Sequence, residues 1–183
     1  GFRRSMHHRF RTLIHRAWRG YARAASTVCV GGFVAAAASA QVRVSQVFGG
    51  GGNVGAPYAS DFVELVNVGA AQDISGWSIQ TASATGSAWN VTALTSVVLL
   101  PGEHLLIKGI DGASVPAGQS SALPTPDVVA SFSLASNDGK VALVSDTVAL
   151  IGTQPSSASI VDFVGFGTLD GWREPFATPS NTH

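Results

Sequence analysis

The chain after residue 40 is a succession of short apolar runs, each four to eight residues long, separated by turn-forming residues. Val, Ile, Phe, Thr and Trp dominate these runs, and several alternate in type with a period of two. No segment after residue 40 shows sustained helical spacing, so the pattern predicts a single all-β domain, a sandwich or a barrel. The predicted strands cover residues 41–48, 61–68, 76–82, 88–94, 97–100, 104–109, 128–134, 140–145, 147–151 and 160–166.

Turn chemistry stands between the runs at Pro101-Gly102, Asp111-Gly112 and 137–139 (Asn-Asp-Gly). Pro101-Gly102 suits a tight turn, which predicts that 97–100 and 104–109 are antiparallel neighbours. Residues 110–127 are rich in Pro, Ser and Gly and are predicted to form a loop.

Alternation predicts which side chains of the run FVELV face the interior. Successive strand residues point to opposite faces, so Val63 and Leu65 share one face, and Phe62, Glu64 and Val66 share the other. We expect Val63 and Leu65 to lie inside.

The run GWSIQTA carries the same kind of signal. Trp77 and Ile79 alternate with Ser78 and Gln80, which predicts that Trp77 anchors the core while the polar pair faces outward. Gly76 is predicted to serve a bend.

Residues 1–40 have the composition of a targeting segment. They hold seven Arg and no acidic residue, and an Arg-rich stretch is followed by STVCVGGFVAAAA and then by Ala38-Ser39-Ala40. A positive region, an apolar region and an A-x-A site in this order predict a secretory signal peptide cleaved between Ala40 and Gln41. Met6 is a candidate start, which makes Gly1–Ser5 an upstream extension. Two alternatives are a membrane anchor, which needs about 20 apolar residues, and an Arg-rich organellar transit peptide.

The remaining chain, residues 41–183, is acidic. It holds four basic residues against 11 acidic ones, so its net charge is 4 − 11 = −7. Nucleic-acid binding usually needs a basic patch, so this charge disfavours strong direct binding. The single cysteine, Cys29, lies in the leader, so the fold of residues 41–183 cannot depend on a disulfide.

A glycine-rich stretch, GGGGNVGAP (49–57), contains a G-x-G-x-x-G match at Gly50, Gly52 and Gly55. A dinucleotide-binding loop needs a helix after it, because the helix N-terminus holds the pyrophosphate. Here Pro57 follows closely and then a predicted strand, so we interpret the stretch as a loop between two strands. Four adjacent glycines lose much entropy on ordering, which predicts a loop that is flexible or ordered only by a partner.

Several segments together resemble the bacterial lamin tail domain. They are VRVSQVFGGGGNVGAPYASDFVELVNVGAAQDISGWSIQ, LLPGEHLLI, GKVALV and IVDFVGFG, and the resemblance extends over nearly all of residues 41–180. It implies an immunoglobulin-like β-sandwich in an exported protein, acting as a non-catalytic binding or tethering module. Larger members of the family continue past the region that corresponds to PFATPSNTH, which leaves open an incomplete last strand and a catalytic domain outside this chain.

The residues offer little material for catalysis. Residues 41–183 hold two histidines, His104 and His183, and nothing near His104 suggests a serine nucleophile. Zinc needs three or four His, Cys or carboxylate ligands, which this composition disfavours. Asp61 and Glu64 are three apart on a strand and face opposite sides, so they cannot form a glycosidase pair. We expect no enzyme activity and no cofactor.

Calcium remains an alternative, because it takes oxygen ligands from Asp, Asn and backbone carbonyls in loops. The calcium candidates are Asn53, Asp61 and Asp73, although no D-x-D-x-D-G pattern is present. Further oxygen donors are Glu64, Asn67, Asp111, Asp127, Asn137, Asp138 and Asp162.

Three functions follow from these observations. The first is a secreted module that binds a protein or glycan partner through loops or a sheet edge. The second is the accessory domain of an extracellular nuclease or phosphatase, and the third is a calcium-stabilised adhesion module. The candidate partner contacts are Gly50, Gly51, Gly52, Asn53, Tyr58 and Trp172.

Overall fold

The computed structural model describes residues 42–112 and 121–167 of the 183-residue chain. These residues fall within one compact unit, Ala37–His183. The predicted leader with Met6, Cys29 and the cleavage site after Ala40, as well as Trp172 and His183, lie outside the described residues. Within the described ranges no helix is long and apolar enough to cross a bilayer.

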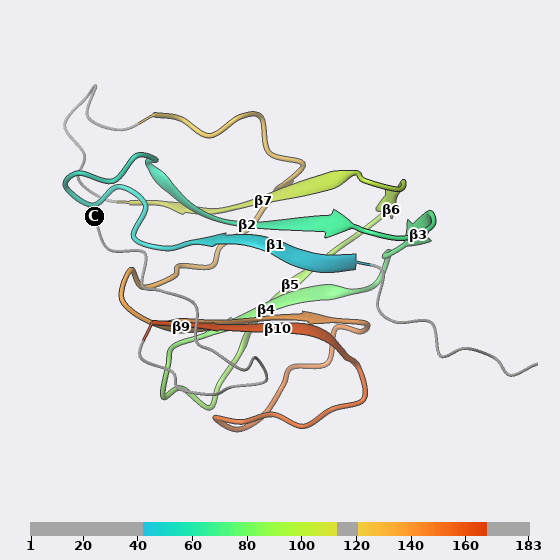
Figure 1. Cartoon of the computed structure of the whole chain (residues 1–183). Coiled ribbons are helices and arrows are strands. Elements are labelled where there is room, and N and C mark those ends of the chain that lie inside the picture. The colour runs from blue at the N-terminus through green and yellow to red at the C-terminus, as the bar shows by residue number, and fades with distance from the viewer. Residues whose placement is uncertain (1–41, 113–120, 168–183) are drawn as a thin grey trace, which may run out of the picture. The chain divides into compact units, whose positions relative to one another are not determined.

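The described residues form an all-β fold without a helix (Figure 1). This confirms the predicted class. The strands are β1 (Val42–Phe48), β2 (Ser60–Asn67), β3 (Gln72–Asp73), β4 (Ser78–Ala82), β5 (Asn90–Ala93), β6 (Val98–Leu99), β7 (His104–Asp111), β8 (Val128–Val129), β9 (Gly139–Val144) and β10 (Ile160–Phe166).

Two four-stranded sheets form the layers that Figure 1 shows one above the other. One has the order β1-β2-β7-β8, in which β8 alone is parallel to its neighbour, and the other has the antiparallel order β10-β9-β4-β5. β3 and β6 form a separate two-stranded ribbon. The arrangement is consistent with a β-sandwich.

The core lies between the sheets and follows the alternation of the strands. Val63 and Leu65 of β2 are completely buried, as predicted, and face Ile79 of β4 and Leu143 of β9 in one cluster. Burial of a side chain such as Leu65 contributes roughly 2 kcal/mol to folding. Trp77 is only partly buried and packs at the margin of this cluster. Gly76 has a φ of 81°, which confirms the predicted bend.

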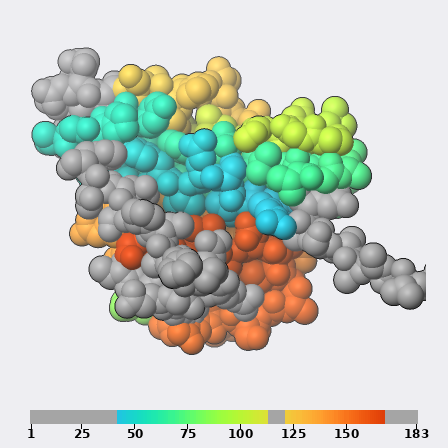
Figure 2. All heavy atoms as spheres, in the orientation of Figure 1, coloured from blue at the N-terminus to red at the C-terminus, as the bar shows by residue number. Residues whose placement is uncertain are grey.

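The edge strands β1 and β10 close one side of the sandwich. The ladder of each with its neighbour is irregular, between Val44 and Gln46 and between Ile160 and Asp162. At this point Asp162 Oδ2 accepts the backbone N–H of Val44 at 2.8 Å. Figure 2 shows β1 lying directly above β10 on this face. Edges that meet in this way are protected from pairing with another chain.

Four strand-level predictions are wrong or incomplete. Residues 147–151 form only a single bridge, between Ala88 and Ile151, and the predicted strand 128–134 shrinks to β8. β3 was not predicted. The Pro101-Gly102 turn exists, but it connects β6 to β7 across two different sheets, because β6 pairs with β3 and β7 pairs with β2 and β8.

The outward orientation predicted for Ser78 and Gln80 is also wrong, since both side chains are completely buried. The segment 146–150 covers them. Ser78 Oγ donates to the carbonyl of Asp146 at 2.6 Å, Gln80 Nε2 donates to that of Val148 at 2.9 Å, and Leu150 N–H donates to Gln80 Oε1 at 2.8 Å. Hydrogen bonds from the side chains of Ser78 and Gln80 therefore hold residues 146–150, in place of the strand ladder predicted for 147–151.

Candidate functional site

The glycine-rich loop after β1 is folded tightly against its own chain. Gly50 and Gly52 have φ angles of 77° and 74°, in the region that favours glycine. Gly50 N–H donates to the carbonyl of Leu134 at 3.2 Å, and Gly52 N–H donates to that of Tyr58 at 2.9 Å. The loop was expected to be flexible or ordered only by a partner, and the second alternative is wrong because hydrogen bonds within the chain hold the loop.

The buried carboxylate of Asp61 holds the loop in place. Its Oδ1 accepts Gly51 N–H at 2.7 Å, and its Oδ2 accepts Leu134 N–H at 2.7 Å and Ser133 Oγ–H at 3.4 Å. Burial raises the pKa of the Asp61 carboxyl above its ordinary value, and the bonds from Leu134 and Gly51 oppose that rise. Asp61 thus joins the glycine loop to the segment before β9.

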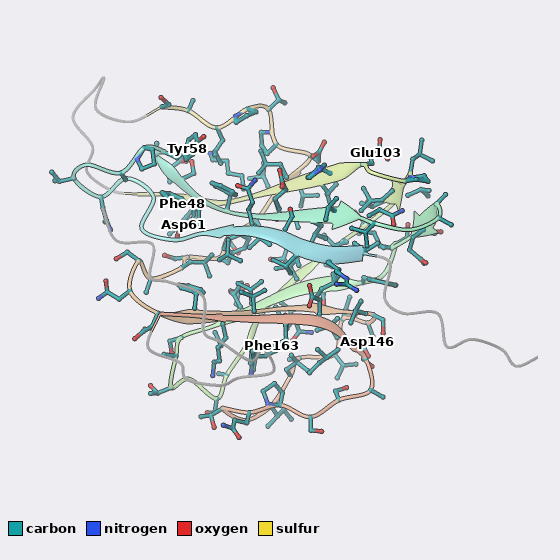
Figure 3. All side chains as sticks on the ribbon, viewed as in Figure 1. Phe48, Tyr58, Asp61, Glu103, Asp146 and Phe163 are labelled. Atoms are coloured by element: carbon teal, nitrogen blue, oxygen red, sulfur yellow. The ribbon has the colours of Figure 1, made fainter. Side chains whose placement is uncertain are left out.

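This geometry changes the role of the predicted partner contacts. Gly50, Gly51 and Gly52 are buried, whereas Asn53 is exposed at the tip, and Gly50, Gly51 and Asn53 line one pocket of about 430 Å³. Tyr58 packs edge-on against Phe48 and Phe62, with ring centroids 5.7 Å apart in each pair. Figure 3 shows Phe48, Tyr58 and Asp61 together at this end of the sandwich.

Of the three calcium candidates, Asn53 and Asp61 line one pocket of about 430 Å³, and Asp73 does not. Both oxygens of Asp61 already accept backbone hydrogen bonds, and Asp73 lies in β3, which follows the far end of β2. Asp73 Oδ1 accepts Ser75 N–H at 2.8 Å, and hydrogen bonds from the Ser75 side chain and backbone lower the pKa of Asp73. Among the described residues no group of three His, Cys, Asp or Glu side chains is placed to hold a metal ion.

A polar row crosses the outer face of β1, β2 and β7. Ser45 Oγ donates to Glu64 Oε1 at 2.6 Å, and His104 Nδ1 lies 3.0 Å from the same oxygen. A hydrolytic triad needs the serine hydroxyl to bond the histidine, whereas here both contact one carboxylate oxygen. The row is therefore a surface hydrogen-bond network, and His104 is an exposed strand residue, as predicted.

The groove of about 510 Å³ beside the start of β7 is the better candidate for a binding site. One wall is the segment that leads into β6 and the other is the start of β8, with His104 and Leu105 of β7 between them. We call this feature the β6–β8 groove. It is lined by Thr95–Leu99, Glu103–Leu105 and Asp127–Val129.

Exposed apolar side chains stand on both walls of the β6–β8 groove. Val98 is 57% exposed and Val129 is 72% exposed, whereas Leu99 and Leu105 are buried beneath. Val98 is exposed because alternation along β6 buries Leu99 and turns its neighbours outward. Exposed apolar side chains that line one concave surface make it a candidate contact site.

The backbone of β7 has an open edge in this groove. Asp127 N–H donates to the carbonyl of Leu106 at 3.0 Å, and Ala130 N–H donates to that of Lys108 at 2.8 Å, so the even-numbered residues of β7 bond toward β8. His104 belongs to this series, but β8 begins opposite Ile107. By this alternation the N–H and C=O of His104 are directed to the same side, and no strand of the described part pairs with β7 there.

Carboxylates give the β6–β8 groove its charge. Glu103 and Asp127 line it, and neither Lys nor Arg does. Glu103 Oε2 accepts Leu100 N–H at 2.7 Å, and Asp127 Oδ2 accepts Leu106 N–H at 2.8 Å, so both oxygens are fixed by local backbone. Glu103 marks the groove end of β7 in Figure 3, opposite the glycine loop.

The sequence prediction missed the β6–β8 groove and favoured the glycine loop. The run VVLL could have indicated the groove, because residues on the outer face of this short strand are as apolar as those on its inner face.

No protein-family model matches the chain, and no curated protein matches it.

Proposed function

We propose that this chain is an exported, non-catalytic β-sandwich module of the lamin tail type, immunoglobulin-like in topology, that binds a protein partner. The observation that carries the proposal is the β6–β8 groove, where exposed valines, fixed carboxylates and an open strand edge converge. Open sheet edges and exposed apolar patches are the features by which non-enzymatic sandwiches recognise partners.

Two further observations support a binding role over catalysis. Ser45, Glu64 and His104 lack the order of contacts that a nucleophile and its base require. The glycine loop, which carries the nucleotide-type motif, is packed closely against its own chain at Gly51, where a Cβ would lie 2.1 Å from the carbonyl carbon of Ser60.

The test compares two valines of equal exposure. Val129 and Val148 are both 72% exposed, but only Val129 lines the β6–β8 groove. The chain is used to capture partners from envelope and culture-fluid proteins, with a glycan array in parallel. Capture of a defined protein that Val129→Ser abolishes and Val148→Ser preserves is the expected result. Capture unaffected by Val129→Ser, groove-dependent binding of a glycan alone, or hydrolysis of plasmid DNA or a phosphate ester by the chain would overturn the proposal.

Export is the second part of the proposal, and it rests on the order of basic, apolar and small residues in the leader. Expression with the leader in a bacterium is expected to yield an exported product whose N-terminus is Gln41. A product that stays in the cytoplasm with its leader intact would contradict export and leave the binding proposal standing.

A further inference from the structure

The shape of the β6–β8 groove points to the chemical class of its occupant. We infer that the groove takes an extended peptide segment that alternates apolar and basic residues and adds as a strand beside His104 of β7. This inference rests on the proposed function and specifies its ligand.

The backbone of β7 sets the conformation of the occupant. His104 presents both a donor and an acceptor toward the groove, and β8 leaves the position beside them unoccupied by any described strand. A segment that satisfies both groups must be extended, since only extended backbone offers a donor and an acceptor at matching spacing. It would lie along β7 on the same side as β8, immediately before the point where β8 begins pairing.

The residues that line the groove determine which side chains a bound segment can carry. Residues of an extended segment alternate between two faces, so one face can contact Val98 and Val129 while the other meets carboxylates. Glu103 and Asp127 stand at the groove without a lining Lys or Arg. The imidazole of His104 lines the groove with its Nδ1 3.0 Å from Glu64 Oε1. The lysine of β7, Lys108, is paired with Asp111 at 2.8 Å. An incoming Lys or Arg therefore meets uncompensated negative charge.

The charge of the described part agrees with this choice of occupant. It contains three basic residues, Arg43, Lys108 and Lys140, against nine acidic ones, which gives 3 − 9 = −6. Lys140 is completely buried, with its Nζ donating to the carbonyl of Gly86 at 2.7 Å. An acidic segment would be repelled by this surface, and the repulsion would weaken with salt.

The experiment measures binding of fluorescent octapeptides to the chain by anisotropy at low and high salt. The probes are an octapeptide alternating Val and Lys, one alternating Val and Glu, one alternating Ser and Lys, and the Val/Lys peptide N-methylated along one edge. We expect the Val/Lys peptide to bind at least tenfold more tightly than the other three, and more weakly at high salt.

Paired variants locate the binding. Val129→Ser and Glu103→Gln are expected to weaken Val/Lys binding at least fivefold. Val148→Ser and Asp146→Asn are the matched controls, because Val148 has the same exposure as Val129 and Asp146 Oδ1 accepts Val148 N–H at 2.9 Å much as Glu103 accepts Leu100 N–H. Melting temperatures within a few degrees of the wild type confirm that the variants are folded.

The outcomes separate this inference from the proposed function. Equal binding of the Ser/Lys and Val/Lys peptides would show charge attraction alone and would overturn the inference, as would binding that survives N-methylation or Val129→Ser. If a partner is captured in a Val129-dependent way but no peptide binds, the function stands and the extended-peptide inference fails.

Discussion

The carboxylate of Asp61 accepts the backbone N–H of Leu134, 73 residues further along the chain, at 2.7 Å. The same carboxylate accepts Gly51 N–H, so one side chain at the start of β2 fixes two irregular segments. Neither segment has a strand ladder of its own here, and each depends on this acceptor. The glycine loop, which resembles a ligand-binding loop in sequence, thus has a structural role: it is tied to the segment around Leu134 through Asp61.

Asp61→Asn tests whether the Asp61 carboxylate holds these two segments together. The amide retains one acceptor oxygen but turns an NH₂ group toward one of the two backbone donors, leaving a buried N–H without an acceptor. A buried unsatisfied donor costs about 1–3 kcal/mol, so we expect a loss of that size in the free energy of unfolding, measured with urea. Asp73→Asn is the control, because Asp73 is exposed. Equal stability of the two variants would show that Asp61 does not hold the loop.

Gly51 and Gly55 serve the loop for different reasons. A Cβ on Gly51 would lie 2.1 Å from the backbone carbon of Ser60, whereas Gly55 has open space around it and a φ of 82°. We therefore expect Gly51→Ala to cost about 3 kcal/mol or more by overpacking. Gly55→Ala is expected to cost about 1–2 kcal/mol through its backbone conformation alone.

Asparagine separates these two causes. It tolerates positive φ better than alanine does, so Gly55→Asn is expected to regain part of the stability lost in Gly55→Ala, while Gly51→Asn regains none. Urea unfolding of the four variants measures this. Recovery at Gly51 would show that space is not its constraint.

Gln80 supports the segment 146–150 through its side-chain amide. Gln80→Met keeps the volume but removes the acceptor of Leu150 N–H and the donor to the Val148 carbonyl. We expect a loss of roughly 1–3 kcal/mol and faster hydrogen exchange at the Leu150 amide than in the wild type. Gln46→Met, at an exposed position of β1, is the control. Unchanged protection of the Leu150 amide would mean that Gln80 does not hold the segment.

The sequence predicted the layers of the fold because alternation is a local signal. Val63, Leu65 and Ile79 are each flagged by their immediate neighbours, and all three are buried. The errors occur where a distant segment satisfies a polar group. Gln80 is polar and alternates outward in sequence, but residues 148 and 150 supply two of its hydrogen bonds, and no local pattern encodes those contacts.

The candidate site was harder to predict for the same reason. The glycine loop contained the conspicuous motif, yet Asp61 accepts hydrogen bonds from Gly51 and Leu134 and so ties the loop to its own chain. The β6–β8 groove joins segments around Val98, His104 and Val129. The open edge at His104 depends on where β8 starts, and β8 is only two residues long. A strand end of this kind is set by tertiary packing rather than by propensity.

The Asp111 carboxylate gives a prediction for acid unfolding. Hydrogen bonds from Lys108 and Ser60 lower the pKa of Asp111 below its ordinary value of 3.8. A carboxyl whose folded pKa is depressed contributes stability above its unfolded pKa, and that contribution is lost as pH falls through the folded pKa. We therefore expect the difference in melting temperature between the wild type and Asp111→Asn to be largest above about pH 5 and to shrink as pH falls below 3.8.

Two comparisons make this acid measurement specific. The raised pKa of Asp61 acts in the opposite direction: its contribution to the stability of the fold is present at low pH and is lost as pH rises past 3.8 toward the raised value. This contribution is common to the wild type and to Asp111→Asn, so it cancels in the difference between their melting temperatures. Lys108→Met removes the cation 2.8 Å from Asp111 and is expected to reproduce part of the same pH profile. A difference that stays constant between pH 2 and pH 6 would show that Asp111 stabilises the fold by packing and not by its charge.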